Sequence, residues 1–216
     1  MAIRPSRVRG LYGVTPYEES TERLLDHVRL AIEGGASIIQ YRNKQATGAQ
    51  QLWQAQALRS LTRAYNVPLI INDGVALARA VDADGVHLGR DDADIAAART
   101  QLPDKLLGVS CYNDLNQAQL AQSAGADYVA FGAPFPSLTK PQAVHAPPAL
   151  FRQARQFLRI PIVAIGGITP ENAPALLEIG IDAVAVISAL FGVADIKAAA
   201  RKFSQLFEES RHVNPQ

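Results

Sequence analysis

Three polar side chains occupy alternate positions at the end of an apolar run: Gln40, Arg42 and Lys44. In an extended chain, side chains two positions apart share one face, so an amide, a guanidinium and an ammonium would point the same way. Arginine binds phosphate oxygens with two parallel hydrogen bonds, and lysine adds a compact positive charge. The spacing predicts a phosphate-binding site, with a solvated strand end as the alternative.

Two aspartates, Asp73 and Asp92, follow two further apolar runs of the sequence. Carboxylates at adjacent strand ends can share one Mg²⁺, a hard ion that takes oxygen ligands and usually keeps several waters. Aspartate is also a frequent cap at the start of a helix, and either residue could serve that purpose. The pair predicts a Mg²⁺ site, and helix capping is the competing interpretation.

Hydroxyl, lysine and glycine residues stand at or just after the ends of the later apolar runs. They are Ser110, Ser137, Thr139, Lys140, Gly166, Gly167 and Ser188. Hydroxyls followed by a lysine suit a phosphate group, and glycines let a phosphate approach backbone N–H groups. These residues are candidates for further phosphate contacts, although a plain tight turn would use the same glycines.

The elements that would position these residues alternate along the chain. Short apolar or β-branched runs occupy residues 10–14, 38–41, 68–72, 85–88, 107–110, 128–131, 162–165 and 183–187. Segments with helical periodicity follow them at residues 22–33, 50–65, 75–80, 95–102, 115–124, 149–157, 172–179 and 196–207. Strands that alternate with helices imply parallel pairing with right-handed crossovers.

A closed barrel and a doubly wound sheet both satisfy this alternation. The strands are short and apolar, and no G-x-G-x-x-G pattern follows the first of them, which favours the barrel. We therefore predict an α/β protein, a (β/α)8 TIM barrel, with residues 1–216 as a single domain. In such a barrel the carboxyl ends of all strands meet at one mouth, where the polar candidates would gather.

Composition narrows the classes of partner. The formal net charge is +1 and the basic residues are scattered, so we predict no nucleic-acid partner. No apolar run approaches the ~20 residues of a membrane helix, so we predict no membrane partner. Cys111 is the only cysteine, which is typical of a reducing compartment and predicts a cytoplasmic protein. We expect Cys111 and Trp53 to be packing residues and His87 to be structural.

Taken together, these residues resemble the thiamin phosphate synthase family. The resemblance extends over residues 11–191, nearly the whole chain. Its motifs are Q-x-R-x-K at 40–44, I-N-D at 71–73, G-V-H-L-G at 85–89, Asp92, G-V-S at 108–110, P-S-L-T-K at 136–140 and I-G-G-I at 165–168. Each motif is short, but their order and spacing over a barrel make the set specific.

The resemblance implies that an aminopyrimidine, carried as its methyl diphosphate, is joined to a hydroxyethylthiazole phosphate with release of pyrophosphate. Asp73 and Asp92 would bind Mg²⁺, and Gln40 would contact the pyrimidine. The groups expected to hold the diphosphate are Arg42, Lys44, Asn72, Ser110 and Lys140, of which all but Asn72 are also the catalytic candidates. The groups expected at the thiazole phosphate are Thr139, Gly167, Ile187 and Ser188, with Ser137 as a further substrate-binding candidate.

Three other functions fit parts of the pattern. A thiazole tautomerase-like relative would share the barrel but lack most of the diphosphate-binding set. A phosphate-binding isomerase or aldolase would be a second possibility, although an aldolase needs a lysine on an inner strand face, and Lys44 and Lys140 stand in loops. The third is a binding protein for thiamin precursors that does no chemistry. A homodimer is expected from analogy with other barrels alone.

Overall fold

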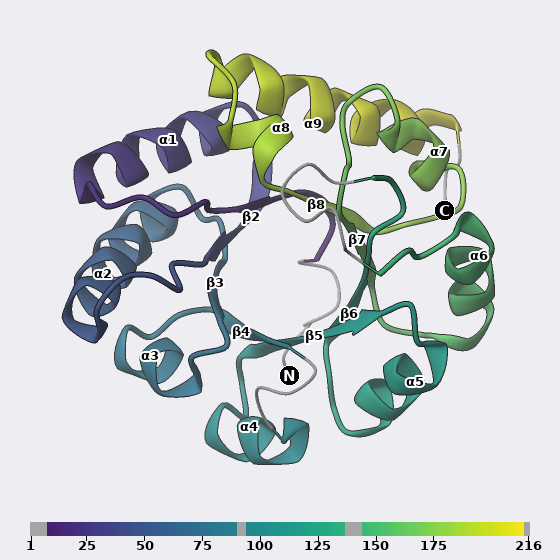
Figure 1. Cartoon of the computed structure of the whole chain (residues 1–216), viewed down its shortest axis with the longest axis horizontal. Coiled ribbons are helices and arrows are strands. Elements are labelled where there is room, and N and C mark those ends of the chain that lie inside the picture. Colours follow the sequence, from purple (N-terminus) through teal and green to yellow (C-terminus); the bar gives the residue numbers. More distant parts are fainter. Residues whose placement is uncertain (1–7, 90–93, 137–143, 214–216) are drawn as a thin grey trace.

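The computed structural model describes residues 8–89, 94–136 and 144–213, and within them eight parallel strands close into a barrel in sequence order (Figure 1). The strands are β1 (Gly10–Val14), β2 (Ala36–Tyr41), β3 (Leu69–Asn72), β4 (Gly85–Leu88), β5 (Leu106–Tyr112), β6 (Tyr128–Phe131), β7 (Ile162–Ile165) and β8 (Ala183–Val186). Each strand pairs with the next, and β8 pairs with β1. The prediction of a TIM barrel is confirmed.

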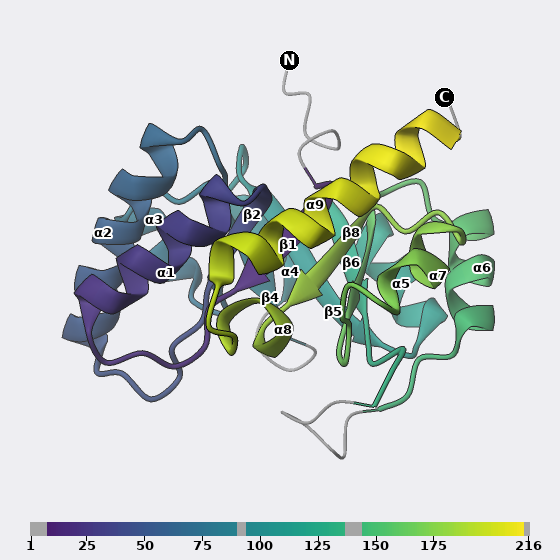
Figure 2. The ribbon, with the colours of Figure 1, turned by 90° about the horizontal axis from the view of Figure 1, so that it is seen from above.

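Helices surround the barrel as an outer ring (Figures 1 and 2). They are α1 (Thr21–Glu33), α2 (Gly48–Ala64), α3 (Val75–Ala80), α4 (Ile95–Gln101), α5 (Leu115–Ser123), α6 (Pro148–Phe157), α7 (Ala173–Leu177), α8 (Ser188–Phe191) and α9 (Ile196–Val213). None of the helices in the described residues is both long and apolar enough to cross a membrane. The short helix α8 was not predicted, because four residues are too few to give a helical period.

The two faces of the strands build two apolar clusters. One cluster fills the barrel and includes Tyr12, Ile38 and Tyr128. The other lies between the strands and the helices and includes Ile39 and Phe203. Neighbouring residues of β2 thus point to opposite faces, as the strand pleat requires. The barrel interior is packed at this level rather than hollow.

Three arginine–aspartate pairs fasten the lower end of the barrel, where the strands begin. The pairs are Arg59–Asp84, Arg99–Asp127 and Arg155–Asp182, and we call them the basal clips. In each clip the aspartate directly precedes β4, β6 or β8, and the arginine comes from α2, α4 or α6. The same aspartate oxygen accepts a hydrogen bond, of 2.8–2.9 Å, from a backbone N–H of the preceding strand, at Leu69, Leu107 or Ile162. Each clip therefore joins a helix and two strands.

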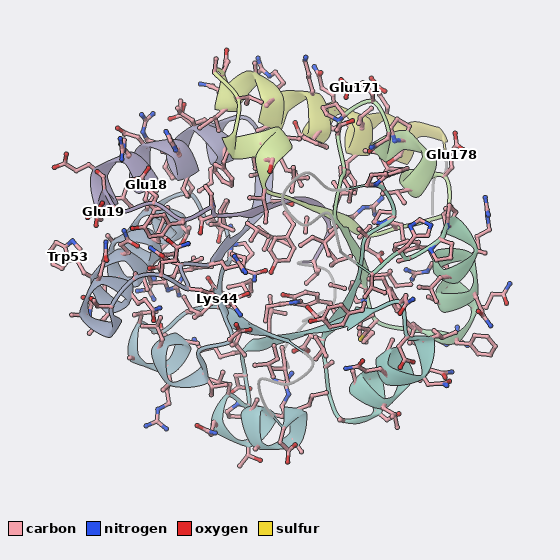
Figure 3. All side chains as sticks on the ribbon, viewed as in Figure 1. Glu18, Glu19, Lys44, Trp53, Glu171 and Glu178 are labelled. Atoms are coloured by element: carbon pink, nitrogen blue, oxygen red, sulfur yellow. The ribbon has the colours of Figure 1, made fainter. Side chains whose placement is uncertain are left out.

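Three local expectations are settled by the structure. Cys111 is fully buried, as predicted. Trp53 is 65% exposed on α2, and Figure 3 shows it pointing away from the barrel, so its prediction as a packing residue is wrong. The N-cap of α3 is Gly74 rather than Asp73, and α4 is capped by Asp94, whose carboxylate accepts a hydrogen bond from the backbone N–H of Ala96.

Candidate active site

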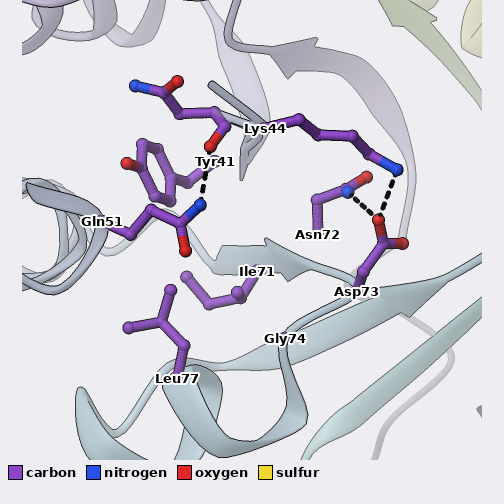
Figure 4. A pocket seen from close by; sticks show the side chains of 9 residues that line it. Tyr41, Lys44, Gln51, Ile71, Asn72, Asp73, Gly74 and Leu77 are labelled. Carbon is purple, nitrogen blue, oxygen red and sulfur yellow. Dashed lines mark hydrogen bonds and ion pairs between the residues drawn. The ribbon is translucent and has the colours of Figure 1, made fainter. Parts of the chain in front are cut away.

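The ends of β2 and β3 bring four of the predicted residues together: Gln40, Lys44, Asn72 and Asp73. The amide nitrogen of Gln40 donates to the amide oxygen of Asn72 at 2.8 Å. The Asn72 nitrogen donates to an oxygen of Asp73 at 2.6 Å, and the Lys44 ammonium lies 2.8 Å from the same oxygen (Figure 4). An amide pair thus extends from inside the barrel to a charged pair at its mouth.

Asp73 is placed by its backbone as well as by its partners. Its φ is +62°, a left-handed conformation that aspartate tolerates better than most residues. Its N–H donates to the carbonyl of His87 at 2.8 Å, which ties the end of β3 to β4. The side chain is 25% exposed, so the carboxylate remains accessible to a ligand or ion.

A cavity of about 390 Å³ lies beside the charged pair. Ile71 and Leu77 form its apolar part, and Lys44, Asn72 and Asp73 belong to its polar lining (Figure 4). Lys44 is 56% exposed and reaches over the strand ends toward the barrel mouth (Figure 3). The pair is therefore open to solvent on one side, as a site for a charged substrate must be.

A second polar group lies deeper in the barrel. His87 is buried, and its Nε2 lies 2.8 Å from the Ser110 hydroxyl while its Nδ1 lies 3.1 Å from the Tyr128 hydroxyl. The hydroxyls of Tyr128 and Tyr12 are 2.8 Å apart, and Tyr12 donates to the Gln40 oxygen at 2.9 Å. Ser110, predicted from its position at the end of an apolar run, is thus connected to Gln40 through three other side chains.

Burial determines the protonation states of three of these side chains, His87, Tyr12 and Tyr128. It lowers the pKa of the His87 imidazole to about 4, so the ring is neutral at pH 7. It raises the pKa of both the Tyr12 and the Tyr128 phenols well above the usual value, so both keep their protons. The lining of the barrel below the mouth is therefore polar but uncharged.

Sequence reasoning did not select Tyr12 and Tyr128. A phenol within an apolar strand is typical of a core residue, and both side chains are indeed fully buried. The available signal was their place on β1 and β6 at inward positions. Tyr12 and Tyr128 are separated by 116 residues, and only barrel closure brings them together.

On the other side of the mouth, the loop after β7 is held by Asn172. Its side-chain nitrogen donates to the carbonyl of Gly167 at 2.9 Å, and its oxygen accepts from the N–H of Thr169 at 2.9 Å. Gly167 has a φ of +65°, and a Cβ there would lie 2.3 Å from the carbonyl oxygen of Pro136. Ile187 and Ser188, at the start of α8, follow β8 at the same end of the barrel.

The remaining predicted residues divide into two groups. Arg42 follows β2, where its N–H donates to the Thr15 hydroxyl at 2.9 Å. Asp92, Ser137, Thr139 and Lys140 lie outside the described residues, so their proposed contacts stay predictions. The structure brings Gln40, Lys44, Asn72 and Asp73 into one cluster.

Comparison of the sequence with known proteins leads to one family. A family model described as thiamine monophosphate synthase matches residues 11–190. Thiamine-phosphate synthase of Methylobacillus flagellatus is 58% identical over 201 residues, covering 93% of this chain and 96% of the relative. The enzyme of the same name from Azoarcus sp. is 55% identical over 202 residues, covering 93% and 98%.

The solved structures lead to the same family. Thiamine phosphate pyrophosphorylase from Pyrococcus furiosus superimposes with a TM-score of 0.85 at 37% identity, covering 94% of this chain and 98% of that one. A 3-hexulose-6-phosphate synthase superimposes with a TM-score of 0.68 at 20% identity, covering 90% and 98%, which shows the shared barrel alone. From its sequence matches and its barrel, this chain belongs to the thiamine monophosphate synthase family of enzymes.

Proposed function

We propose that this enzyme joins an aminopyrimidine methyl diphosphate to a hydroxyethylthiazole phosphate, giving thiamin phosphate and pyrophosphate with Mg²⁺ bound. The observation that carries the proposal is the contact of Lys44, Asp73 and Asn72 at the mouth, directly above the Gln40 amide. A cation, a carboxylate and amides at one strand edge suit a diphosphate joined to a polar ring.

The chemistry needs charge stabilisation more than proton transfer. The bond between the pyrimidine methylene and the diphosphate oxygen breaks, and its electron pair leaves with the pyrophosphate. The thiazole nitrogen then supplies its lone pair to form the new carbon–nitrogen bond, and the thiazole becomes a cation. Fixed positive groups near the departing oxygens stabilise the charge that develops there. The other contribution to the rate comes from holding the thiazole nitrogen in line with the pyrimidine methylene that it attacks.

The roles of the individual residues follow from this division. Lys44, with Arg42 and Lys140, would hold the diphosphate and stabilise it as it leaves, and Asn72 and Ser110 would complete its contacts. Gln40 would orient the pyrimidine. The thiazole phosphate would be bound by Ser137, Thr139, Gly167, Ile187 and Ser188, in part through backbone N–H groups.

Asp73 and Asp92 are the proposed Mg²⁺ ligands. Mg²⁺ commonly binds through one or two carboxylates together with substrate phosphates and waters. The Asp73 carboxylate suits such a site because it is an accessible oxygen donor beside the cavity. Within the described ranges, no group of three or more His, Cys, Asp or Glu side chains could hold a metal ion. When bound, Mg²⁺ would neutralise part of the pyrophosphate charge.

The first experiment measures thiamin phosphate and pyrophosphate formed from the two purified substrates, with Mg²⁺ and then with EDTA. Equal amounts of both products, formed only with Mg²⁺, are expected. A folded protein that gives no product would overturn the proposal and favour a tautomerase or a binding protein for thiamin precursors.

Substitutions then test the residue assignments. Lys140→Ala and Asp92→Ala are each expected to lower kcat/KM by about a hundredfold or more. Arg152→Ala, which changes an exposed cation on α6, is the matched control and should keep the wild-type rate. Rates near wild type in both site variants would remove these two residues from the proposed site.

The proposal extends to three properties of the whole protein. We propose that residues 1–216 form one domain, that the enzyme is a homodimer by analogy with other barrels, and that it works in the cytoplasm, as its single cysteine suggests. Light scattering of the purified protein at micromolar concentration tests the dimer, because a mass of 23.2 kDa per particle would exclude it.

A further inference from the structure

Seven side chains form a continuous series of hydrogen bonds across the barrel. In order they are Ser110, His87, Tyr128, Tyr12, Gln40, Asn72 and Asp73, and we call them the cross-barrel series. The six contacts measure 2.8, 3.1, 2.8, 2.9, 2.8 and 2.6 Å. The residues come from six strands, β1 to β6, and the turn after β3, so the series crosses the interior from β5 to β3.

The charged end of the series determines the direction of its first bonds. Asp73, paired with Lys44, is a carboxylate and can only accept hydrogen bonds. The Asn72 nitrogen must therefore face Asp73, which turns the Asn72 oxygen toward Gln40. Gln40 then donates through its nitrogen, and its oxygen is left to accept from Tyr12.

The same counting continues through the two phenols. Each phenol has one proton, and the proton of Tyr12 is given to Gln40. The proton between the two phenols must then belong to Tyr128. With that proton used, the Tyr128 oxygen can only accept from His87, so Nδ1 of the imidazole must carry the hydrogen.

We infer that Asp73 fixes the direction of the whole cross-barrel series, and that Tyr12, Tyr128 and His87 are positioning residues that orient Gln40 and Ser110. In this arrangement His87 is the Nδ1–H tautomer, and its bare Nε2 accepts the proton of the Ser110 hydroxyl. The Gln40 amide has one orientation, with its oxygen toward Tyr12 and its nitrogen toward Asn72.

The other neutral tautomer of His87, with its hydrogen on Nε2, leaves one hydrogen bond of the series unmade. If Nε2 carried the hydrogen, Nδ1 would accept the proton of Tyr128. No hydrogen would then lie between the phenol oxygens of Tyr12 and Tyr128, which are 2.8 Å apart and fully buried. An unmade hydrogen bond in such a place favours the intact arrangement by about tenfold or more. Neutral imidazole and neutral phenols, which burial maintains here, are the forms that the counting requires.

The consequence for recognition rests on the proposed function. Gln40 is expected to meet the aminopyrimidine, and a fixed amide distinguishes donors from acceptors on that ring whereas a freely rotating amide does not. The Ser110 hydroxyl gives its proton to His87 in the unliganded protein, so it must turn that proton away from His87 before it can donate to a diphosphate oxygen. The series thus pre-orients the Gln40 amide before the pyrimidine arrives.

Nitrogen-15 NMR of the imidazole rings tests the tautomer without any substrate or metal. The chain has four histidines, and the His87 signals can be assigned by their loss in His87→Gln. At pH 7 the wild type is expected to show a protonated Nδ1 and a bare Nε2 at His87. A protonated Nε2 would overturn the inference and leave the proposed function intact, because no catalytic measurement enters.

Tyr12→Phe tests whether the series acts at a distance. Tyr12 is connected to His87 only through Tyr128, so its hydroxyl should matter at His87 only through the direction of the bonds. We expect the single tautomer to be replaced by a mixture. Tyr41→Phe is the matched control, because this buried hydroxyl donates to Gln54, outside the series, and its loss should not change the His87 spectrum.

An unchanged tautomer in a folded Tyr12→Phe would contradict the inference. Should that variant fail to fold, Asp73→Gly removes the acceptor at the far end, suits the positive φ of this position, and is expected to yield a mixture of tautomers as well. A kinetic measurement completes the test. Tyr12→Phe should raise KM for the pyrimidine diphosphate about five- to tenfold, since Gln40 loses one hydrogen bond that fixes it, and leave KM for the thiazole phosphate unchanged.

Discussion

The Lys44 ammonium lies 2.8 Å from the Asp73 carboxylate although the two residues belong to loops after different strands. The pair holds a cation proposed to bind the diphosphate and a proposed metal ligand in contact before substrate arrives. In a diphosphate–Mg²⁺ complex, the diphosphate oxygens could bind the Lys44 ammonium and the Mg²⁺ could bind the Asp73 carboxylate. Two contacts would then replace the single contact between Lys44 and Asp73. The pair therefore keeps both groups ordered at little cost in affinity.

Lys44→Ala should separate activity from stability. We expect kcat/KM to fall about a hundredfold or more, because a fixed cation at the departing pyrophosphate is lost. The free energy of unfolding should change by less than about 1 kcal/mol, since Lys44 is mostly exposed and such pairs are screened by water. Lys105→Ala, which removes a Lys–Asp pair with Asp82 away from the mouth, is the control and should retain full activity. Equal rates in the two variants would contradict the role of Lys44.

Asn172→Ala should weaken one substrate selectively. The Asn172 side chain bonds to both Gly167 and Thr169, so its loss releases the loop proposed to bind the thiazole phosphate. KM for that substrate is expected to rise about tenfold, as for the loss of one or two hydrogen bonds. Gln122→Ala, which also removes side-chain bonds to backbone N–H groups but at the lower end of the barrel, should leave both KM values alone. An equal rise for both substrates would argue against a local role.

Asp127→Asn tests a basal clip. The variant keeps the shape of the side chain but loses the charge-assisted bonds to Arg99 and to the N–H of Leu107. We expect the free energy of unfolding to fall by about 1–3 kcal/mol in urea titration, with kcat unchanged. Asp182→Asn should lower the free energy of unfolding by less, because the Asp182 side chain is 29% exposed against 14% for Asp127. The reverse order of cost would show that burial does not govern these clips.

Gly108→Ala should disturb the cross-barrel series, because Gly108 on β5 pairs with Tyr128 on β6. A Cβ at Gly108 would lie 2.0 Å from Cζ of Tyr128, and that ring is fully buried. Moving the ring is expected to lower the free energy of unfolding by at least about 1–3 kcal/mol. It should also break the hydrogen bond between Tyr128 and His87. Gly48→Ala is the control, since its Cβ would meet nothing within 4 Å. Combining Gly108→Ala with Tyr128→Val should cost less than the sum of the two single changes.

The sequence was sufficient to predict the barrel and the members of the mouth cluster. Alternating strands and helices leave few topologies, and residues at strand ends then share one mouth by geometry alone. Gln40, Lys44 and Asp73 were found in this way, and Asn72 through the family resemblance. The structure connects the four in succession by hydrogen bonds and one ion pair. The pairing of Lys44 with Asp73 itself was not predicted, because loop conformation determines it.

The deeper polar residues were harder to find. Tyr12 and Tyr128 stand among apolar neighbours, where a phenol is usually core, and their partners are far away in the sequence. His87 was interpreted as structural, and the structure agrees, because the side chain is buried and both ring nitrogens have hydrogen-bond partners. The prediction for Trp53 was wrong, because one apolar side chain on α2 does not determine which face it joins.

The basal clips also bear on how the chain folds as it is made. Their partners are separated by only 25, 28 and 27 residues, so each clip closes a short loop of sequence. Closing such a loop costs little chain entropy compared with joining β1 to β8. During synthesis, the first clip can form once β4 has left the ribosome, and the others follow in turn. The final closure of the barrel would then join preassembled parts whose strand register is already set.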